Sequence, residues 1–179
     1  MCIELKMVNI EKEAEETIRF ITDRMLGKLS TWLRILGYDT IYASEVKGDC
    51  VEEDESLAAL AEHEARILLT RDKILAASAT RKGAQCVHMK TGVVMGQLKE
   101  LLRHYPNLNL EPFLIRCSLC NGRLRKVREE EEEDMLREKS YVPTSMIGEC
   151  DFWICNCCGQ IYWKGSHWRD MRERLKELQ

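Results

Sequence analysis

The stretch RFITDRMLGKLSTWLRILGYDT, residues 19–40, joins a short apolar segment to an amphipathic helix through one acid, Asp23. RFIT is typical of a strand, and apolar residues recur at helical spacing over 25–36. We expect the helix to end at Gly37, because a C-terminal cap needs left-handed backbone. An acid at such a junction is explained either by helix capping or by an active site.

Short apolar runs and amphipathic helices alternate from residue 18 to about residue 105. Strands are expected at TIYA, RILLT and QCVHM, and helices at 54–65, 73–81 and 97–105. This alternation favours parallel strand pairing with right-handed crossovers. RILLT is apolar on both faces, as a central parallel strand should be. We therefore predict an α/β sandwich with a central parallel sheet.

The composition is that of a soluble globular protein, with 179 residues, 45% hydrophobic and 32% charged. This length supports one ordinary core and a small appended module. No apolar run approaches the roughly 20 residues of a membrane span, so no membrane insertion is expected. The acidic N-terminal segment lacks the apolar core of a secretory signal, which predicts a cytoplasmic protein.

The pattern changes near residue 112, where paired cysteines, aromatic residues and charge runs replace the strand and helix alternation. We predict an N-terminal lead-in over 1–17, an α/β domain over 18–112, and a cysteine-rich module over 113–179 that ends in a basic helix. An acidic block at 129–134 lies inside that module and is expected to be a loop. Much of the negative charge is concentrated there, so the folded faces should be more basic than the net charge of −3 suggests.

Acidic residues are expected at one edge of the predicted sheet. Asp23 and Asp72 each follow a strand, and parallel strands share their carboxyl end. Asp54 is predicted to open a neighbouring helix. Three such acids would suit Mg²⁺ or Mn²⁺, whereas capping explains each acid taken singly. Bases that would suit phosphate contacts, or would form an ordinary solvated face, lie beside the acids: Arg24, Lys28, Arg34 and Arg71.

Six of the nine cysteines fall in the last third of the chain, which favours metal binding over disulfides in a protein without a secretion signal. Cys117 and Cys120 form one C-x₂-C pair, and Cys155 and Cys158 form another. Four thiolates suit a tetrahedral structural zinc ion. Iron is the alternative, since CNCCGQIYW also resembles a rubredoxin knuckle, and Cys157 could replace a neighbour as ligand.

Several motifs in order carry a family resemblance: RFITDRMLGKLSTWLRILGYDT, EDESLAALA, RILLTRD and FWICNCCGQIYWKGSHW. Over about residues 18–170 the chain resembles the Mut-seven C-terminal RNase domain family, a PIN-like nuclease domain fused to a zinc ribbon. The resemblance implies a PIN-like three-layer sandwich that cleaves RNA with a divalent metal. By motif position, Lys28 and Arg34 match basic positions, and the nuclease acids would be Asp23, Asp54 and Asp72, with Glu55 as a neighbour.

The chain departs from many PIN domains in one respect. A further acid near or beyond the TRD motif is missing, since Lys73 and Ile74 follow and KTGVVMGQ at 90–97 contains none. One bound metal is therefore as consistent with the sequence as two. Two other functions stay open: a non-catalytic RNA-binding or ribonucleoprotein adaptor on the same fold, with the acids as caps, and a module for protein partners. The aromatic and basic tail would either dock RNA or pack the ribbon.

Overall fold

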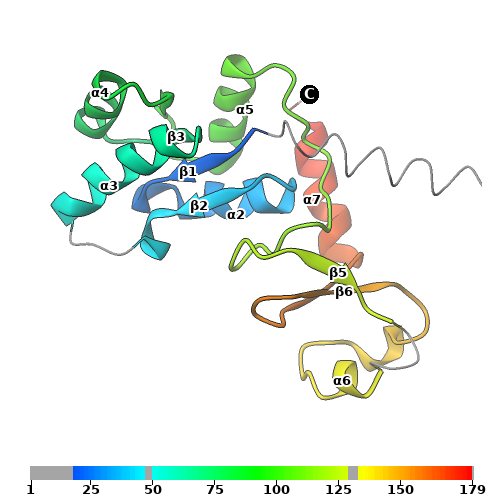
Figure 1. The fold of residues 1–179 in the computed structure, drawn as a ribbon. Helices are drawn as coiled ribbons and strands as arrows, with labels where there is room; N and C mark the ends of the chain where they lie inside the picture. Colours follow the sequence, from blue (N-terminus) through cyan, green and yellow to red (C-terminus); the bar gives the residue numbers. More distant parts are fainter. Residues whose placement is uncertain (1–17, 47–49, 129–132, 179) are drawn as a thin grey trace, which may run out of the picture. The chain divides into compact units, whose positions relative to one another are not determined.

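The computed structural model describes residues 18–46, 50–128 and 133–178 (Figure 1). The predicted lead-in over 1–17 lies outside these residues, as does most of the predicted acidic loop, residues 129–132. The described chain contains a four-stranded sheet and a three-stranded sheet. It divides into two compact units, one from within 1–27 and 38–88 and the other from within 28–37 and 89–179.

The first unit is built on a parallel sheet. Its strands are β1 (Phe20–Thr22), β2 (Thr40–Tyr42), β3 (Ile67–Thr70) and β4 (Cys86–His88), in the order β2-β1-β3-β4. Every neighbouring pair is parallel. All residues of β3 are buried, as its two apolar faces predicted. The predicted α/β class with a central parallel sheet is therefore confirmed, and each strand falls within the run expected for it.

Two helices cover one face of this sheet. They are α3 (Cys50–His63) and α4 (Lys73–Arg81), and short 3₁₀ helices η2 (Arg24–Leu26) and η3 (Ala43–Glu45) follow β1 and β2. Leu57 and Ala61 of α3 and Leu75 of α4 share one buried cluster with Ile21 and Leu68 of the sheet. Burial of these apolar side chains fixes the sheet register, because a slip by one residue would turn them to the opposite face.

The second unit contains the helices α2 (Gly27–Ile35, from Lys28 onward), α5 (Val94–His104), α6 (Glu133–Arg137), η4 (Thr144–Met146) and α7 (Ser166–Lys176). The α2 helix ends as predicted, since Gly37 has a φ of +90°. The amide of Phe113 donates to the carbonyl of Ile35 at 2.9 Å, which ties α2 to the segment after α5. The compact units thus place α2 and α5 with the cysteine-rich segment, whereas the domain boundary near 112 stays a prediction from sequence.

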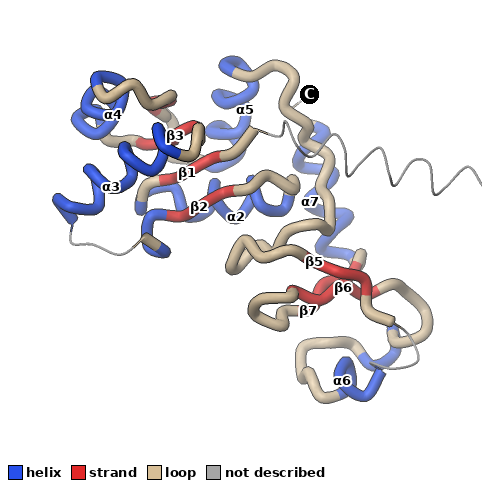
Figure 2. The backbone as a smooth tube through the Cα atoms, in the orientation of Figure 1, coloured by secondary structure: helices blue, strands red, loops and turns tan. Residues whose placement is uncertain are grey.

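A small antiparallel sheet organises the cysteine-rich part of the second unit. Figure 2 shows its strands β5 (Leu124–Lys126), β6 (Phe152–Cys155) and β7 (Ile161–Trp163), paired in that order. The acidic block is not loop throughout, because α6 begins at Glu133. The sheet's own apolar cluster comprises Val127, Leu136, Val142, Phe152, Ile154 and Ile161. So few apolar residues give a module of this size little stability without a metal.

None of the helices in the described ranges combines the length and the apolar character that a bilayer crossing requires.

Candidate functional site

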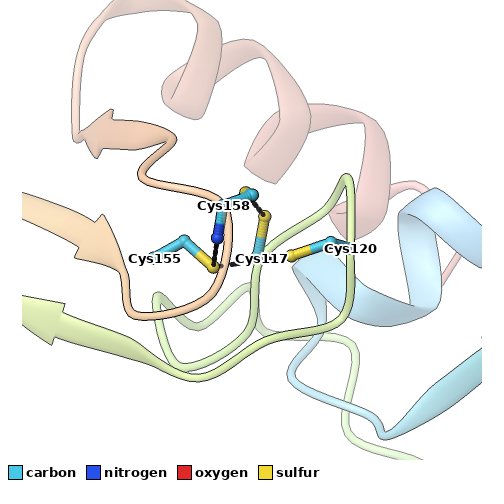
Figure 3. A group of neighbouring side chains, drawn as sticks. All are labelled: Cys117, Cys120, Cys155 and Cys158. Atoms are coloured by element: carbon cyan, nitrogen blue, oxygen red, sulfur yellow. Dashed lines mark hydrogen bonds between the residues drawn. The ribbon is translucent and has the colours of Figure 1, made fainter.

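Four cysteines converge from two separate loops of the second unit (Figure 3). Their sulfur atoms all lie within 4.8 Å of one another. The Sγ atoms of Cys117 and Cys158 are 3.5 Å apart, and those of Cys120 and Cys155 are also 3.5 Å apart. A tetrahedral ion with metal to sulfur distances of about 2.3 Å requires sulfurs roughly 3.8 Å apart. The predicted ligands therefore come together in a cluster compatible with a structural metal such as zinc.

Backbone geometry around the cluster depends on a glycine. A Cβ atom on Gly122 would lie 2.9 Å from Sγ of Cys155 and 2.8 Å from Cβ of Cys157, so a side chain has no room there. The amides of Cys157 and Cys158 donate to Sγ of Cys155 at 3.4 and 3.5 Å. Such amide donors stabilise a metal-bound thiolate. Cys157 is itself exposed and outside the set of four.

Each thiol of the cluster must lose its proton to become a metal-bound thiolate. Burial raises the pKa of the Cys158 thiol to about 12. Metal binding must displace these protons, so metal affinity is expected to fall as the pH falls.

Two further side chains support the cluster, and neither role was predicted. The Tyr162 hydroxyl lies 3.1 Å from Sγ of Cys117 and accepts from the amide of Ser118 at 3.2 Å. Burial raises the pKa of Tyr162, so it stays a phenol that can donate to a thiolate. Arg34 donates to the carbonyl of Leu119, between two cysteine ligands, at 2.8 Å.

The burial of Arg34 changes its interpretation. Its side chain is 3% exposed, so it holds the cysteine loop and does not face solvent, where an RNA phosphate would be met. The predicted RNA contact is wrong for this residue. Its partner lies 85 residues away in sequence, which periodicity alone could not reveal.

In the first unit, Asp23 lies at the carboxyl end of β1, beside the end of β3. It is only 6% exposed. Its Oδ1 atom accepts from the amide of Met25 at 2.8 Å, and its Oδ2 atom accepts from the hydroxyl of Thr70 and from the amide of Arg71 at 3.0 Å. Asp23 therefore caps η2, and it is also bound to the loop that follows β3.

Asp72 lies at the same sheet edge and is exposed. Its Oδ1 atom accepts from the amides of Ile74 and Leu75 at 2.6 and 3.0 Å, which caps α4. Its own amide donates to Oγ1 of Thr70 at 2.9 Å. Thr70, which sequence reasoning missed, thus joins the two acids. Within the described ranges Oδ2 of Asp72 accepts no hydrogen bond, so one oxygen faces solvent.

Asp54 and Glu55 are exposed on α3. The prediction that Asp54 opens its helix is wrong, because α3 begins at Cys50 and Asp54 lies in the second turn. Among the described residues, only the four cysteines form a set of three or more His, Cys, Asp or Glu ligand atoms within 4.8 Å of one another. The structure therefore links Asp23 to the backbone of Asp72 through Thr70, and it does not bring the carboxylates of Asp23, Asp54 and Asp72 together within that distance.

Basic and imidazole groups accompany the acidic edge. Arg24 is exposed, and Arg71 is half-buried with an Nε atom that has no hydrogen-bond partner among the described residues. A buried guanidinium N–H of this kind suits an anionic ligand. His88 ends β4 opposite Thr70, with its Nε2 atom 3.2 Å from the carbonyl of Arg71. His88 has no partner at ligand spacing in the sequence, so no pattern would have identified it.

The comparisons with known proteins identify a family. The family model described as Mut7-C RNAse domain matches residues 18–175. The chain therefore belongs to the Mut7-C RNAse domain family, and the resemblance carried by its motifs is confirmed. A search of curated proteins and a search of solved structures each gave no match. The family description points to a nuclease role connected with RNA.

Proposed function

We propose, from membership of the Mut7-C RNAse domain family, that this chain is a metal-dependent ribonuclease that hydrolyses RNA phosphodiester bonds. The observation that carries the proposal is the link between Asp23 and Asp72 through Thr70 at the carboxyl edge of the parallel sheet. Ligand and catalytic groups of open parallel sheets collect at this edge. A cytoplasmic location is proposed from the sequence.

The donor set at the edge fits a hard cation. Magnesium keeps several of its waters and needs only one or two direct carboxylate ligands. Asp72 offers a solvent-facing oxygen, and Asp23 and Asp54, with Glu55 as a neighbour, would supply the remaining carboxylates. Mg²⁺ or Mn²⁺ bound there would screen charge on the phosphoryl oxygens and make a bound water more acidic.

The protein's own contribution is to fix these groups before substrate arrives. Three donors hold the Asp23 carboxylate, so its position does not have to be organised during the reaction. Arg24, which is exposed, and Arg71, which is half-buried, would contact phosphate oxygens. Lys28 is exposed in the first turn of α2 and stays a proposed RNA contact, whereas Arg34 is assigned to the cysteine loop.

The ribbon is proposed to assist RNA docking and to be held together by zinc. The cluster of Cys117, Cys120, Cys155 and Cys158 supports a structural ion, because all four ligand positions are taken by protein. Elemental analysis of the purified protein decides between zinc and iron, with one zinc per chain as the expected result.

A second candidate function is a non-catalytic RNA-binding adaptor. It is favoured by the capping hydrogen bonds of Asp23 and Asp72, and because no three acids of the described residues have carboxylate oxygens within 4.8 Å of one another. An adaptor would bind RNA without any need for a divalent ion at the acidic edge.

Metal dependence separates the two functions. Zinc-loaded protein is incubated with single-stranded and structured RNA in Mn²⁺, Mg²⁺, Ca²⁺ or no added divalent ion, beside Asp23→Asn. The nuclease predicts cleavage in Mn²⁺ or Mg²⁺ that is lost in the variant. RNA binding with no cleavage above that of Asp23→Asn in any metal would support the adaptor instead.

A further inference from the structure

The second unit contains a hollow of about 530 Å³ between the end of β7 and the start of α7. This volume lies in the range of ordinary ligand sites. The hollow lies within one compact unit and draws on η4, on the turn after β7 and on the first turns of α7. Its lining includes Pro143, Met146, Trp163, Lys164, Ser166 and Arg169.

Two cations line the hollow. Lys164 and Arg169 are exposed, and no carboxylate of the described residues forms an ion pair with either. The Nζ atom of Lys164 lies 5.5 Å from the ring centroid of Trp153 and 5.9 Å from that of Trp168. Contacts with two indoles restrict this long side chain, so less entropy is lost when it meets an anion.

An aromatic surface lies beside the cations. Trp163 packs against Phe152 with ring centroids 6.0 Å apart, and it remains half-buried where it borders the hollow. A Cβ atom on Gly165 would lie 2.8 Å from the indole Nε1 of Trp163, so glycine lets the turn pass close to the ring. Met146 adds an adaptable apolar side chain to the same lining.

We propose that this hollow is a docking subsite for a nucleotide of single-stranded RNA. An unpaired base would pack against Trp163 and Met146, and its phosphate would meet Lys164 and Arg169. The combination of an aromatic surface with the two cations favours RNA over an acidic peptide, because an acidic peptide would need only the cations. Duplex RNA is recognised by shape across a wide groove, so a single hollow suits unpaired bases better. The assignment of RNA as the ligand of this subsite rests on the proposed function.

Binding is tested on the full zinc-loaded chain with a fluorescent single-stranded RNA and no added Mg²⁺ or Mn²⁺, so that cleavage does not interfere. Lys164→Gln and Arg169→Gln should each raise Kd about 5-fold and make the salt dependence shallower by about 0.7 in log Kd against log salt. The matched control is Arg174→Gln, on the same helix and outside the hollow, which should stay within about 2-fold of wild type. Zinc content and the unfolding midpoint should be unchanged in all three.

Trp163→Leu tests the base contact, because leucine keeps apolar packing but has no ring for stacking. It should weaken binding of single-stranded RNA by about 5-fold or more and leave duplex RNA binding unchanged. Equal losses for both RNAs would overturn the assignment of a stacked base.

The outcome is distinguishable from failure of the nuclease proposal. Under multiple-turnover conditions in Mn²⁺, Lys164→Gln and Arg169→Gln should raise KM far more than they lower kcat. If both bind RNA as tightly as Arg174→Gln does, the subsite is wrong while cleavage by the acidic edge is untouched. If they lose affinity for a polyglutamate peptide and keep it for RNA, the hollow serves an acidic protein partner and the proposal is overturned.

Discussion

The cysteine cluster and the acidic sheet edge are both candidate metal centres, and they differ in how far the protein chain has assembled them. The four thiols already lie within 4.8 Å of one another and point inward from two loops (Figure 3). At the acidic edge, Asp23 and Asp72 are joined through Thr70, and their oxygens are partly occupied by backbone amides.

The difference follows from the chemistry of the two ion classes. A structural zinc ion takes all four of its ligands from protein, so the fold must bring them into van der Waals range. A magnesium-type ion keeps waters and takes substrate oxygens, so its carboxylates need not touch one another. Capping and metal binding are therefore compatible at Asp72, which uses one oxygen for α4 and leaves the other to solvent.

The largest expected effect is that the cysteine-rich module, residues 113–179, loses its folded structure when it can no longer bind metal. Cys117→Ser should lose the bound zinc and the near-ultraviolet circular dichroism of Trp153 and Trp163, because apparent zinc binding contributes about 10 kcal/mol or more to folding. Elemental analysis and the dichroism spectrum measure this. Cys157→Ser is the control, since Cys157 lies outside the set of four and its backbone amide, which contacts Cys155, is kept in the variant. Equal zinc loss in both variants would make Cys157 a ligand.

A smaller effect is expected at the link between the two acids. Thr70→Val removes the hydroxyl that donates to Asp23 and accepts from the amide of Asp72. The loss should lower the free energy of unfolding by about 1 to 3 kcal/mol, because two polar groups lose a partner. Urea unfolding measures the change. Thr22→Val is the matched control on β1, where the hydroxyl reaches its acceptor only at 3.5 Å and should matter less. If the two variants lose similar amounts of unfolding free energy, Thr70 does not link Asp23 and Asp72.

The smallest effect concerns alkaline pH. Burial, with a lesser contribution from the charge of Asp23, raises the pKa of the Cys86 thiol from 9.0 to about 11. The unfolded thiol ionises first, so the stability contributed by Cys86 is present below pH 9 and is lost as the pH rises toward 11. Over that interval the stability difference between wild type and Cys86→Ala should shrink by about 1 kcal/mol, after allowance for solvent screening. Chemical denaturation curves from pH 8 to pH 11 measure this. If the difference in unfolding free energy between wild type and Cys86→Ala stays constant over that range, the prediction is wrong.

Local signals sufficed for most of the first unit. RILLT predicted a central parallel strand because both faces are apolar, and Asp72 predicted the start of α4 because Asp is a favoured cap. The same capping signal misplaced the start of α3. Asp49 precedes Cys50 in the sequence and carries the same preference as Asp54, so composition alone could not choose between them.

The site residues that were mispredicted or missed depend on contacts between residues far apart in the sequence. Arg34 was predicted to be an RNA contact from its charge, yet its partner is a carbonyl in the cysteine loop. Thr70 and His88 gain their meaning only when β3 pairs with β4 in register. The cysteine cluster was predictable in full, because a pair of C-x₂-C motifs encodes its own geometry at short range.

The most direct test of the central claim is the rate of Mn²⁺-dependent RNA cleavage by Asp72→Asn, compared with wild type at equal zinc content. Asparagine is as good a helix cap as aspartate, so the unfolding midpoint should stay within the error of wild type. A carboxylate that binds metal cannot be replaced by an amide without loss of charge, so the rate should fall by about 100-fold or more. An Asp72→Asn variant that cleaves RNA at the wild-type rate would show that Asp72 is only a cap and would contradict the account.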